Sequence, residues 1–424
     1  MEPLSDICHA NRRQFLHRAG LCGAAWLTPL AHLLARAAEG EKRRKPAQSI
    51  LVLWLQGGPS QLETFDPHPN TDIAAGTVAI PTAVKNVQFA AGLERTAEEM
   101  PSLALIRSMV SKEGDHERGV YTMKTGFRPD PTILHPSIGA VCCHELPEAG
   151  VDIPRHVSIL PAQWPSRGGF LGDGYDAFKT GDPAQNVSDT HSRASRERDE
   201  QRLKHLEVVE NAFARGRAGR IETTGHRETM ERARRMMTSE QLKAFEVARE
   251  PLALRRAYGD TPFGRGCLAA RRLVEVGVRC VEVTLDGWDT HVNNHALQRK
   301  LVDILDPALS ALIRDLRERD LLQRTLVVVA GEFGRTPKMN AVGGRDHWPN
   351  GFSVALAGGG IRGGRVVGET DPEGKQKPSE PVTVGDLHAT LLQAVGIDSN
   401  KIHRAPIGRT VRFSEGKPLA DLLE

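Results

Sequence analysis

Short, unbroken runs of apolar and often β-branched residues recur along the chain and predict strands. They cover residues 49–55, 103–109, 156–160, 278–285, 326–330 and 352–357. Runs of this length are typical of strands that are buried on both faces of a parallel sheet. Residues 67–100, which contain scattered apolar positions among Pro, Asn and Gly, predict a loop with short strands.

Helical periodicity fills the stretches between several of these runs. The predicted helices cover residues 120–124, 132–146, 268–276, 297–319 and 383–392. Gly126 and Gly396 follow two of them, where glycine usually ends a helix. A strand, a helix and the strand at Leu326 follow one another as in a parallel crossover unit. We therefore expect an α/β fold with a mostly parallel sheet flanked by helices.

The texture changes between about residues 192 and 250, where Arg, Glu, Lys and Gln dominate. Leu203, Leu206, Val209 and Phe213 recur there at helical spacing. This pattern predicts amphipathic, solvent-facing helices that are inserted beside the main sheet. The charged surface is either a solvated face or the binding surface for a protein partner.

The N-terminus has the pattern of an export signal. Arg12 and Arg13 form a twin-arginine motif, and an apolar segment at 19–34 precedes a small-x-small cleavage site at 35–37. We expect a signal peptide over residues 1–38, a domain over 48–424, and a periplasmic or secreted protein without a stable transmembrane span. The alternative is an uncleaved membrane anchor. Because this route exports folded proteins that often carry a metal, it is a hint of a bound ion.

Composition excludes some classes of function. The 424 residues are 39% hydrophobic and 26% charged, which is ample for a large core. A net charge of +3 and only 5% aromatic residues do not favour nucleic acid as a partner. Four cysteines follow the leader, and their spacing is not that of a zinc ribbon: Cys142, Cys143, Cys267 and Cys280. Apolar residues surround Cys142 and Cys143, which predicts buried thiols. A disulfide among the four stays unassigned.

Polar clusters follow four of the predicted strands. They lie at residues 56–66, 115–116, 286–295 and 332–347. The carboxyl ends of parallel strands meet at one edge of a sheet, so these clusters are expected to lie together. Carboxylates and imidazoles suit a divalent ion such as zinc, manganese or calcium. Such an ion polarises a phosphoryl or sulfuryl oxygen and activates water.

We assign candidate roles within these clusters. His116 is a candidate general base or ligand, and Arg335 a candidate binder of an anionic group. The candidate metal ligands are Asp289, His291, Glu332, Asp346 and His347. The alternative is a set of salt-bridged surface loops, in which Arg335 pairs with a neighbouring carboxylate.

Several motifs resemble the family called domain of unknown function 1501. They are residues 57–66, 286–291, 331–337, 344–349 and 357–361. The resemblance covers about residues 48–423, and the twin-arginine leader is also typical of the family. It implies an alkaline phosphatase-like fold, the superfamily of sulfatases and phosphomutases.

The chain departs from the pattern of that superfamily at three positions. Gln56 stands where its enzymes place an aspartate, His116 falls near their nucleophile, and Glu332-Phe333 replaces their Asp-His pair. The resemblance thus implies the fold more firmly than the activity. One hypothesis is a metal-dependent hydrolase of phosphate or sulfate esters, acting on a small molecule or glycan through a non-standard site. The alternative is a non-catalytic binding or assembly protein of the envelope.

Overall fold

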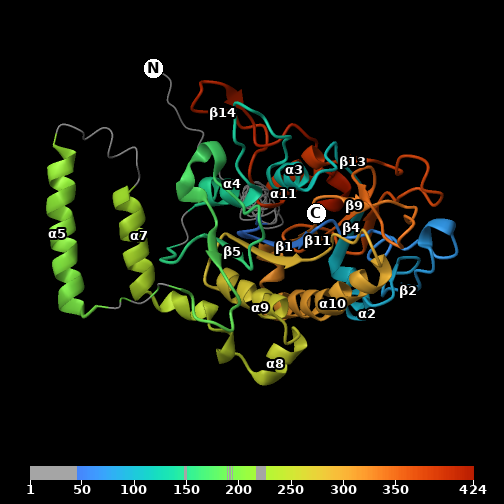
Figure 1. Ribbon diagram of the computed structural model, residues 1–424, viewed down its shortest axis with the longest axis horizontal. Helices are drawn as coiled ribbons and strands as arrows, with labels where there is room; N and C mark the ends of the chain where they lie inside the picture. The colour runs from blue at the N-terminus through green and yellow to red at the C-terminus, as the bar shows by residue number, and fades with distance from the viewer. Residues whose placement is uncertain (1–44, 148–149, 189, 191, 193, 216–225) are drawn as a thin grey trace, which may run out of the picture. The chain divides into compact units, whose positions relative to one another are not determined.

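A nine-stranded sheet organises the described part of the chain in a computed structural model (Figure 1). The structure describes residues 45–424 except 148–149, 189, 191, 193 and 216–225. The signal peptide expected over residues 1–38 lies outside this part, so export stays a prediction. Pro46–Glu424 form one compact unit. Among the described residues, no helix is both long and apolar enough to cross a membrane.

The centre of the sheet is parallel. β1 (Ser49–Gln56) lies between β7 (Cys280–Asp286) and β8 (Thr325–Ala330), and it pairs with both in parallel. Beyond β7, β5 (His156–Ile159) and β6 (Phe178–Thr180) continue the sheet, again in parallel. The expected parallel arrangement is confirmed here.

The other side of the sheet contains one reversal. β11 (Phe352–Ala357) pairs antiparallel with both β8 and β4 (Leu103–Val110). β12 (Arg365–Val367) and β13 (Val382–Thr383) then pair with β4 in parallel. Since β4 and β8 are both antiparallel to β11, β4 runs in the same direction as β1, β7 and β8. The carboxyl ends of these four strands therefore share one edge.

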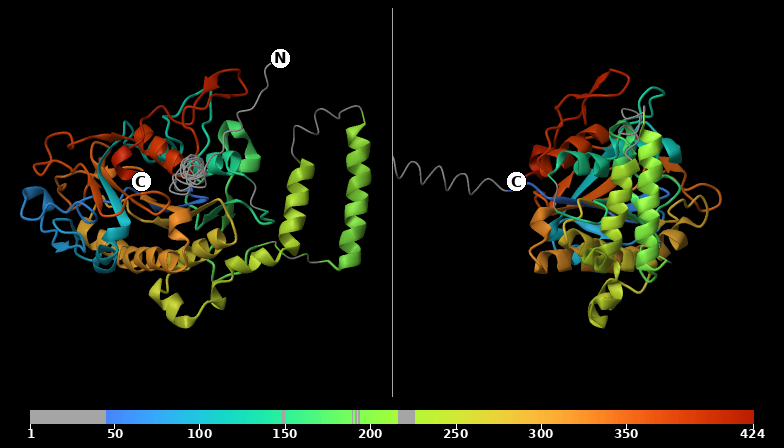
Figure 2. Two further views of the ribbon diagram at one scale, coloured as in Figure 1. Left: turned by 180° about the vertical axis from the view of Figure 1, so that it is seen from behind. Right: turned by 90° about the vertical axis from the view of Figure 1, so that its left-hand side faces the viewer.

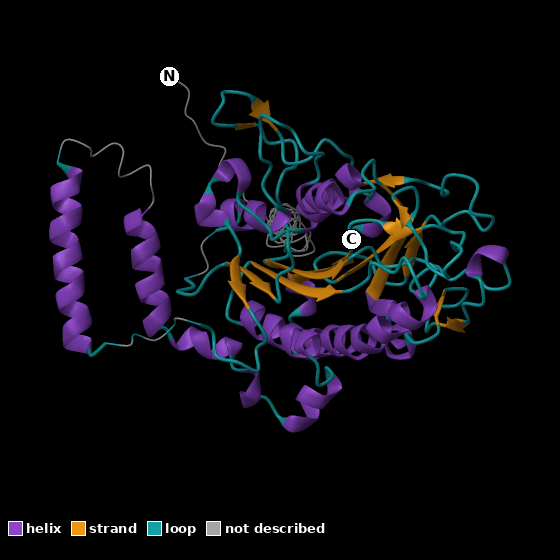
Figure 3. Ribbon diagram, viewed as in Figure 1, coloured by secondary structure: helices purple, strands orange, loops and turns teal. Residues whose placement is uncertain are grey.

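Alternate residues of β1 enter two different cores. Leu51, Leu53 and Leu55 pack in the core that includes α9 (Pro262–Glu275) and α10 (Asn294–Glu318). Ile50, Val52 and Trp54 pack in the core on the other face, with residues of three helices: α3 (His116–Thr125), α4 (Ile138–Glu145) and α11 (Val384–Ala394). This alternation follows from the two-residue period of a strand. Figures 2 and 3 show helices on both faces of the sheet.

Helix starts differ from the predicted ones where a cap decides the first residue. α3 begins four residues earlier than expected because the Asp115 carboxylate accepts a hydrogen bond from Arg118 N at 3.2 Å. α4 begins only after Ser137, whose hydroxyl caps Ala140 N. The earlier start of α3 places His116 on the helix itself. The shorter elements are α2 (Glu94–Glu98), α8 (Leu252–Ala257), β2 (Ala79–Pro81), β3 (Gln88–Ala90), β14 (His403–Arg404) and β15 (Thr410–Val411).

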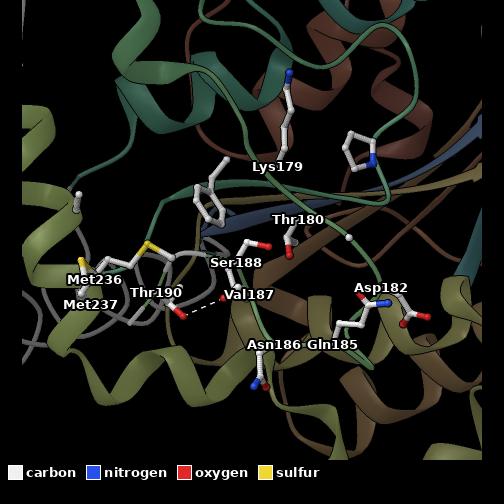
Figure 4. A pocket seen from close by; sticks show the side chains of 14 residues that line it. Lys179, Thr180, Asp182, Gln185, Asn186, Val187, Ser188, Thr190, Met236 and Met237 are labelled. Carbon is white, nitrogen blue, oxygen red and sulfur yellow. Dashed lines mark hydrogen bonds between the residues drawn. The ribbon is translucent and has the colours of Figure 1, made fainter. Parts of the chain in front are cut away.

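The charged insertion is only partly outside the core. On α5 (Arg196–Ala214), Val208 and Val209 are 68% and 63% exposed, as expected for solvent-facing helices. However, Met236 of α7 (His226–Thr238) and Phe245 are buried in the core that contains α9 and α10. A cavity of about 590 Å³ lies between α7 and the segment that contains and follows β6, and no candidate metal ligand lines it. Figure 4 shows the side chains that line this cavity. The peripheral segment therefore ends before Met236 rather than at residue 250.

All four cysteines of the described chain are buried and free. Burial raises the pKa of Cys143 to about 12 and raises the pKa of Cys142 further. The expectation of buried thiols is thus confirmed for Cys142 and Cys143, and no disulfide joins the described residues.

A buried ion pair joins α3 to β7. Lys124 Nζ donates to Glu282 Oε1 at 2.9 Å and to Trp164 O at 3.0 Å. The two charged side chains are only 8% and 4% exposed. Because α3 begins at His116 and β7 leads to Asp289, this pair helps to set the relative positions of two candidate site residues.

We expect Glu282→Leu to lower the free energy of unfolding by about 3–5 kcal/mol, because it leaves the Lys124 ammonium buried without its partner. The double variant Lys124→Met/Glu282→Leu should recover most of that loss. Urea denaturation measures both. Asp303→Ala, which removes the exposed ion pair with Arg299, is the control and should change stability by less than about 0.5 kcal/mol. A Glu282→Leu cost as small as the control would contradict the coupling.

Candidate metal centre

The predicted site residues meet at the shared edge of the sheet. His116 begins α3, which follows β4, whereas Asp289 and His291 lie in the loop after β7. Glu332 follows β8 directly, and His347 lies in the two-residue strand β10 (His347–Trp348). Segments that are up to 231 residues apart thus contribute to one cluster, as the four strand ends predicted.

The Asp289 carboxylate is the centre of this cluster. Its Oδ1 lies 3.1 Å from His291 Nε2 and 3.2 Å from His347 Nε2. Its Oδ2 lies 3.3 Å from His116 Nε2. The two ring nitrogens of His291 and His347 are themselves 3.0 Å apart. Ligand atoms of His116, Asp289 and His347 all lie within 4.8 Å of one another.

Each of the three imidazoles has its other nitrogen, Nδ1, beside an oxygen acceptor. The acceptors are Glu332 Oε1 at 2.7 Å from His116, Asp346 Oδ1 at 2.8 Å from His291, and Gly114 O at 2.8 Å from His347. An acceptor at Nδ1 keeps the proton of a neutral ring there and leaves a lone pair on Nε2. Three Nε2 atoms therefore face the Asp289 carboxylate. Histidines that bind a metal through one ring nitrogen usually donate the other N–H to an acceptor, as these three rings can.

Charges and burial shift the pKa values of these groups in different directions. Burial alone would raise the pKa of Asp289, but the hydrogen bond and charge of Arg335 outweigh it and lower the pKa to about 2. Burial lowers the pKa of His347, which favours its neutral ring. The hydrogen bond to Glu332 raises the pKa of His116. The two nitrogens of His116 thus lie between two carboxylates, with Nδ1 beside Glu332 and Nε2 beside Asp289.

Glu332 and Asp346 lie behind the histidines in this geometry. Glu332 is fully buried, and its Oε1 also accepts hydrogen bonds from Gln56 Nε2 at 3.1 Å and Gly57 N at 2.9 Å. Both carboxylates orient an imidazole, Glu332 that of His116 and Asp346 that of His291. Their predicted role as direct ligands stays a prediction, whereas their contacts assign them a positioning role.

Arg335 is also placed differently from its predicted role. Its side chain is fully buried, and Nη2 donates to Asp289 Oδ1 at 2.5 Å and to Gly57 O. Nε donates to Gly58 O at 2.9 Å and Nη1 to Arg345 O at 3.0 Å. The guanidinium is therefore engaged inside the protein, as in the alternative reading, and holds Asp289 rather than facing an incoming anion.

Some features of the site were not apparent from the sequence. The acceptor for His347 is the backbone carbonyl of Gly114, and the type of a residue does not predict such a role for its backbone. Gly57 has a φ of 114°, and a Cβ there would lie 2.5 Å from Asp289 N. The paired glycines at residues 57–58 indicate that another part of the chain comes close to the backbone there, but they do not indicate that this part is Asp289. His295, which was part of the cluster at 286–295, instead contacts Glu63 at 3.3 Å.

Comparisons with known proteins identify a family. A family model described as "Protein of unknown function (DUF1501)" matches residues 47–423. No curated protein matches.

The chain has a weak likeness to several solved structures. A sulfatase from Pseudoalteromonas sp. is 12% identical over 85% of this chain and 70% of its own, with a TM-score of 0.39. A phosphonate monoester hydrolase from Silicibacter pomeroyi is 11% identical (89% and 76%, TM-score 0.35). Alkaline phosphatase from the Antarctic bacterium TAB5 is 10% identical (84% and 100%, TM-score 0.33). At these values the likenesses carry no argument about activity.

A residue other than glycine held at positive φ typically costs about 1–3 kcal/mol. We expect Gly57→Ala to cost more than this, because the new Cβ would also clash with Asp289 N. Gly76→Ala is the control, since Gly76 has a φ of 96° with nothing within 4 Å of a Cβ. Urea denaturation of both variants separates the backbone strain from the clash. Equal losses in the two variants would show that the approach of Gly57 to Asp289 is unimportant.

Proposed function

We propose that this chain, which belongs to the DUF1501 family, is an exported, metal-dependent hydrolase of phosphate or sulfate esters. The observation that carries the proposal is the convergence of three Nε2 atoms on one carboxylate, each ring held at Nδ1 by an acceptor. Twin-arginine export to the periplasm or beyond is part of the proposal and rests on the leader motif.

The residues fit zinc better than the other ions considered. The proposed ligands are His116, Asp289, His291 and His347, which offer three nitrogens and one oxygen. Ligands of tetrahedral zinc lie about 2.0–2.1 Å from the metal, and so about 3.3 Å from one another. Asp289 Oδ1 lies 3.1 and 3.2 Å from the Nε2 atoms of His291 and His347, and Oδ2 lies 3.3 Å from that of His116. Calcium and manganese prefer sites richer in oxygen.

The residues of the chain supply positioning and access. When bound, zinc would polarise the ester and lower the pKa of water. Arg335 keeps Asp289 ionised, and the acceptors at Nδ1 keep the rings turned inward. The side chains of Asp289 and His291 are 45% and 44% exposed, so an ester group of a small molecule or glycan can reach them.

Water is the nucleophile in this proposal because α3 begins with an imidazole, not with a hydroxyl or thiol. The water oxygen bonds to phosphorus or sulfur while the bond to the ester oxygen breaks. The departing alcohol gains one proton of the water. The second proton stays on the phosphate product or, when the product is the more acidic sulfate, is released to solvent. No covalent intermediate with the protein is involved.

We expect about one zinc per purified chain, measured by inductively coupled plasma mass spectrometry. His347→Ala should lower zinc affinity by at least tenfold, because one of the four ligands is lost. Saturating zinc should raise the unfolding temperature of the wild type, in line with about 2.7 kcal/mol at 100 times the Kd. His295→Ala, the same change in the first turn of α10, should bind zinc as the wild type does. Wild-type protein that binds no zinc would overturn the centre.

We expect zinc-loaded protein to hydrolyse p-nitrophenyl phosphate or p-nitrophenyl sulfate, and Asp289→Asn to lower kcat/KM at least 100-fold. The reason is that the amide loses the charge on which all three rings converge. The released nitrophenolate measures the rate, and His295→Ala should keep it. Zinc binding without turnover on these or on esterified glycans would favour the non-catalytic binding protein instead.

A further inference from the structure

We propose that Asn340 is a positioning residue of this centre, acting on His291 through both ends of its amide. The inference rests on the proposed function, because it concerns the same metal site. Asn340 is half-buried in the loop between β9 (Gly334–Arg335) and β10. It lies between the two family motifs at residues 331–337 and 344–349.

The orientation of the Asn340 amide follows from its neighbours. Oδ1 accepts hydrogen bonds from two backbone donors, Val342 N at 3.1 Å and Gly344 N at 2.9 Å. Backbone N–H groups only donate, so this end of the amide must be the oxygen. Nδ2 is therefore the other end, and it faces two acceptors.

Those two acceptors both belong to the surroundings of His291. Nδ2 donates to His291 O at 3.0 Å and to Asp346 Oδ1 at 3.4 Å. The same Asp346 oxygen lies 2.8 Å from His291 Nδ1. Asn340 thus holds the backbone of His291 and the carboxylate that orients its ring. A single side chain fixes both the position and the rotation of one ligand.

The loop closes tightly over this contact. Asn340 N donates to Gly344 O at 2.8 Å, and Asn294 N donates to Gly343 O at 2.8 Å. A Cβ on Gly344 would lie 1.8 Å from His291 O, so the two loops touch through their backbones. The Asn340 amide lies at this junction. Losing its Nδ2 donor should shift His291 relative to the other ligands and leave the backbone of the loop that contains Asn340 in place.

Asn340→Asp separates the two functions of the residue. A carboxylate still accepts from Val342 N and Gly344 N, so the loop keeps its local hydrogen bonds. It cannot donate to His291 O or Asp346, and it places a second negative charge beside Asp346. Any loss that appears in this variant therefore comes from the end that faces His291.

The test is a zinc titration of the full chain in competition with a chelating dye, together with the absorption spectrum of the cobalt-substituted protein. We expect Asn340→Asp to lower zinc affinity 10- to 100-fold, as is typical when a partner of a ligand is removed, and to alter the cobalt spectrum. Asn400→Asp is the control, because Asn400 also accepts a hydrogen bond through Oδ1, from Arg412 at 3.4 Å. It should leave both measurements unchanged.

A double-mutant cycle of Asn340→Asp with His291→Ala distinguishes positioning of His291 from a general loss of structure. In a His291→Ala background, Asn340→Asp should change zinc affinity by less than about twofold, because the ligand on which it acts is gone. An equal loss with and without His291, or wild-type affinity in Asn340→Asp, overturns the inference and leaves the centre standing. Wild-type protein without zinc affinity overturns both, so the two failures are distinguishable.

Discussion

The contact between the buried Arg335 and the half-exposed Asp289 is the interaction on which the rest of the site depends. The guanidinium lies where three loops meet, and it donates to the loop after β1, to Arg345 O and to the carboxylate after β7. A fully buried cation is tolerated only when its donors are satisfied and a charge opposes it. Asp289 provides that charge, and so its position is set by the same contacts that join the strand ends.

Charge balance follows from this arrangement. The cluster contains the carboxylates of Asp289, Glu332 and Asp346 and one guanidinium, which leaves a formal charge of minus two when the imidazoles are neutral. A divalent cation among the three Nε2 atoms would compensate that charge. The hydrogen bond that His116 donates to Glu332 raises the pKa of His116, so protonation of this ring also offsets part of the negative charge.

The strands and their common edge could be predicted because both depend on regular patterns. Continuous apolar runs predicted β1, β7 and β8, and parallel pairing then required their ends to meet. The roles within the cluster could not be predicted in the same way. Asp289 and Glu332 are both carboxylates after a buried strand, and only the direction of each side chain makes one the centre and the other a support. The acceptor at Gly114 O and the reach of Asn340 depend on the backbone path, which the sequence does not show.

The three positions at which the sequence departs from the pattern that it resembles lie in one hydrogen-bonded cluster. Gln56 Nε2 and His116 Nδ1 contact the same oxygen of Glu332, at 3.1 and 2.7 Å. An aspartate at position 56 would place a second carboxylate beside this buried one, with no donor between them. The amide supplies the donor instead, and Trp54 Nε1 binds its oxygen at 2.7 Å. Hydrogen bonds from Gln56, Gly57 and His116 thus satisfy the buried Glu332 oxygen, and the ion that we propose is placed around Asp289 instead.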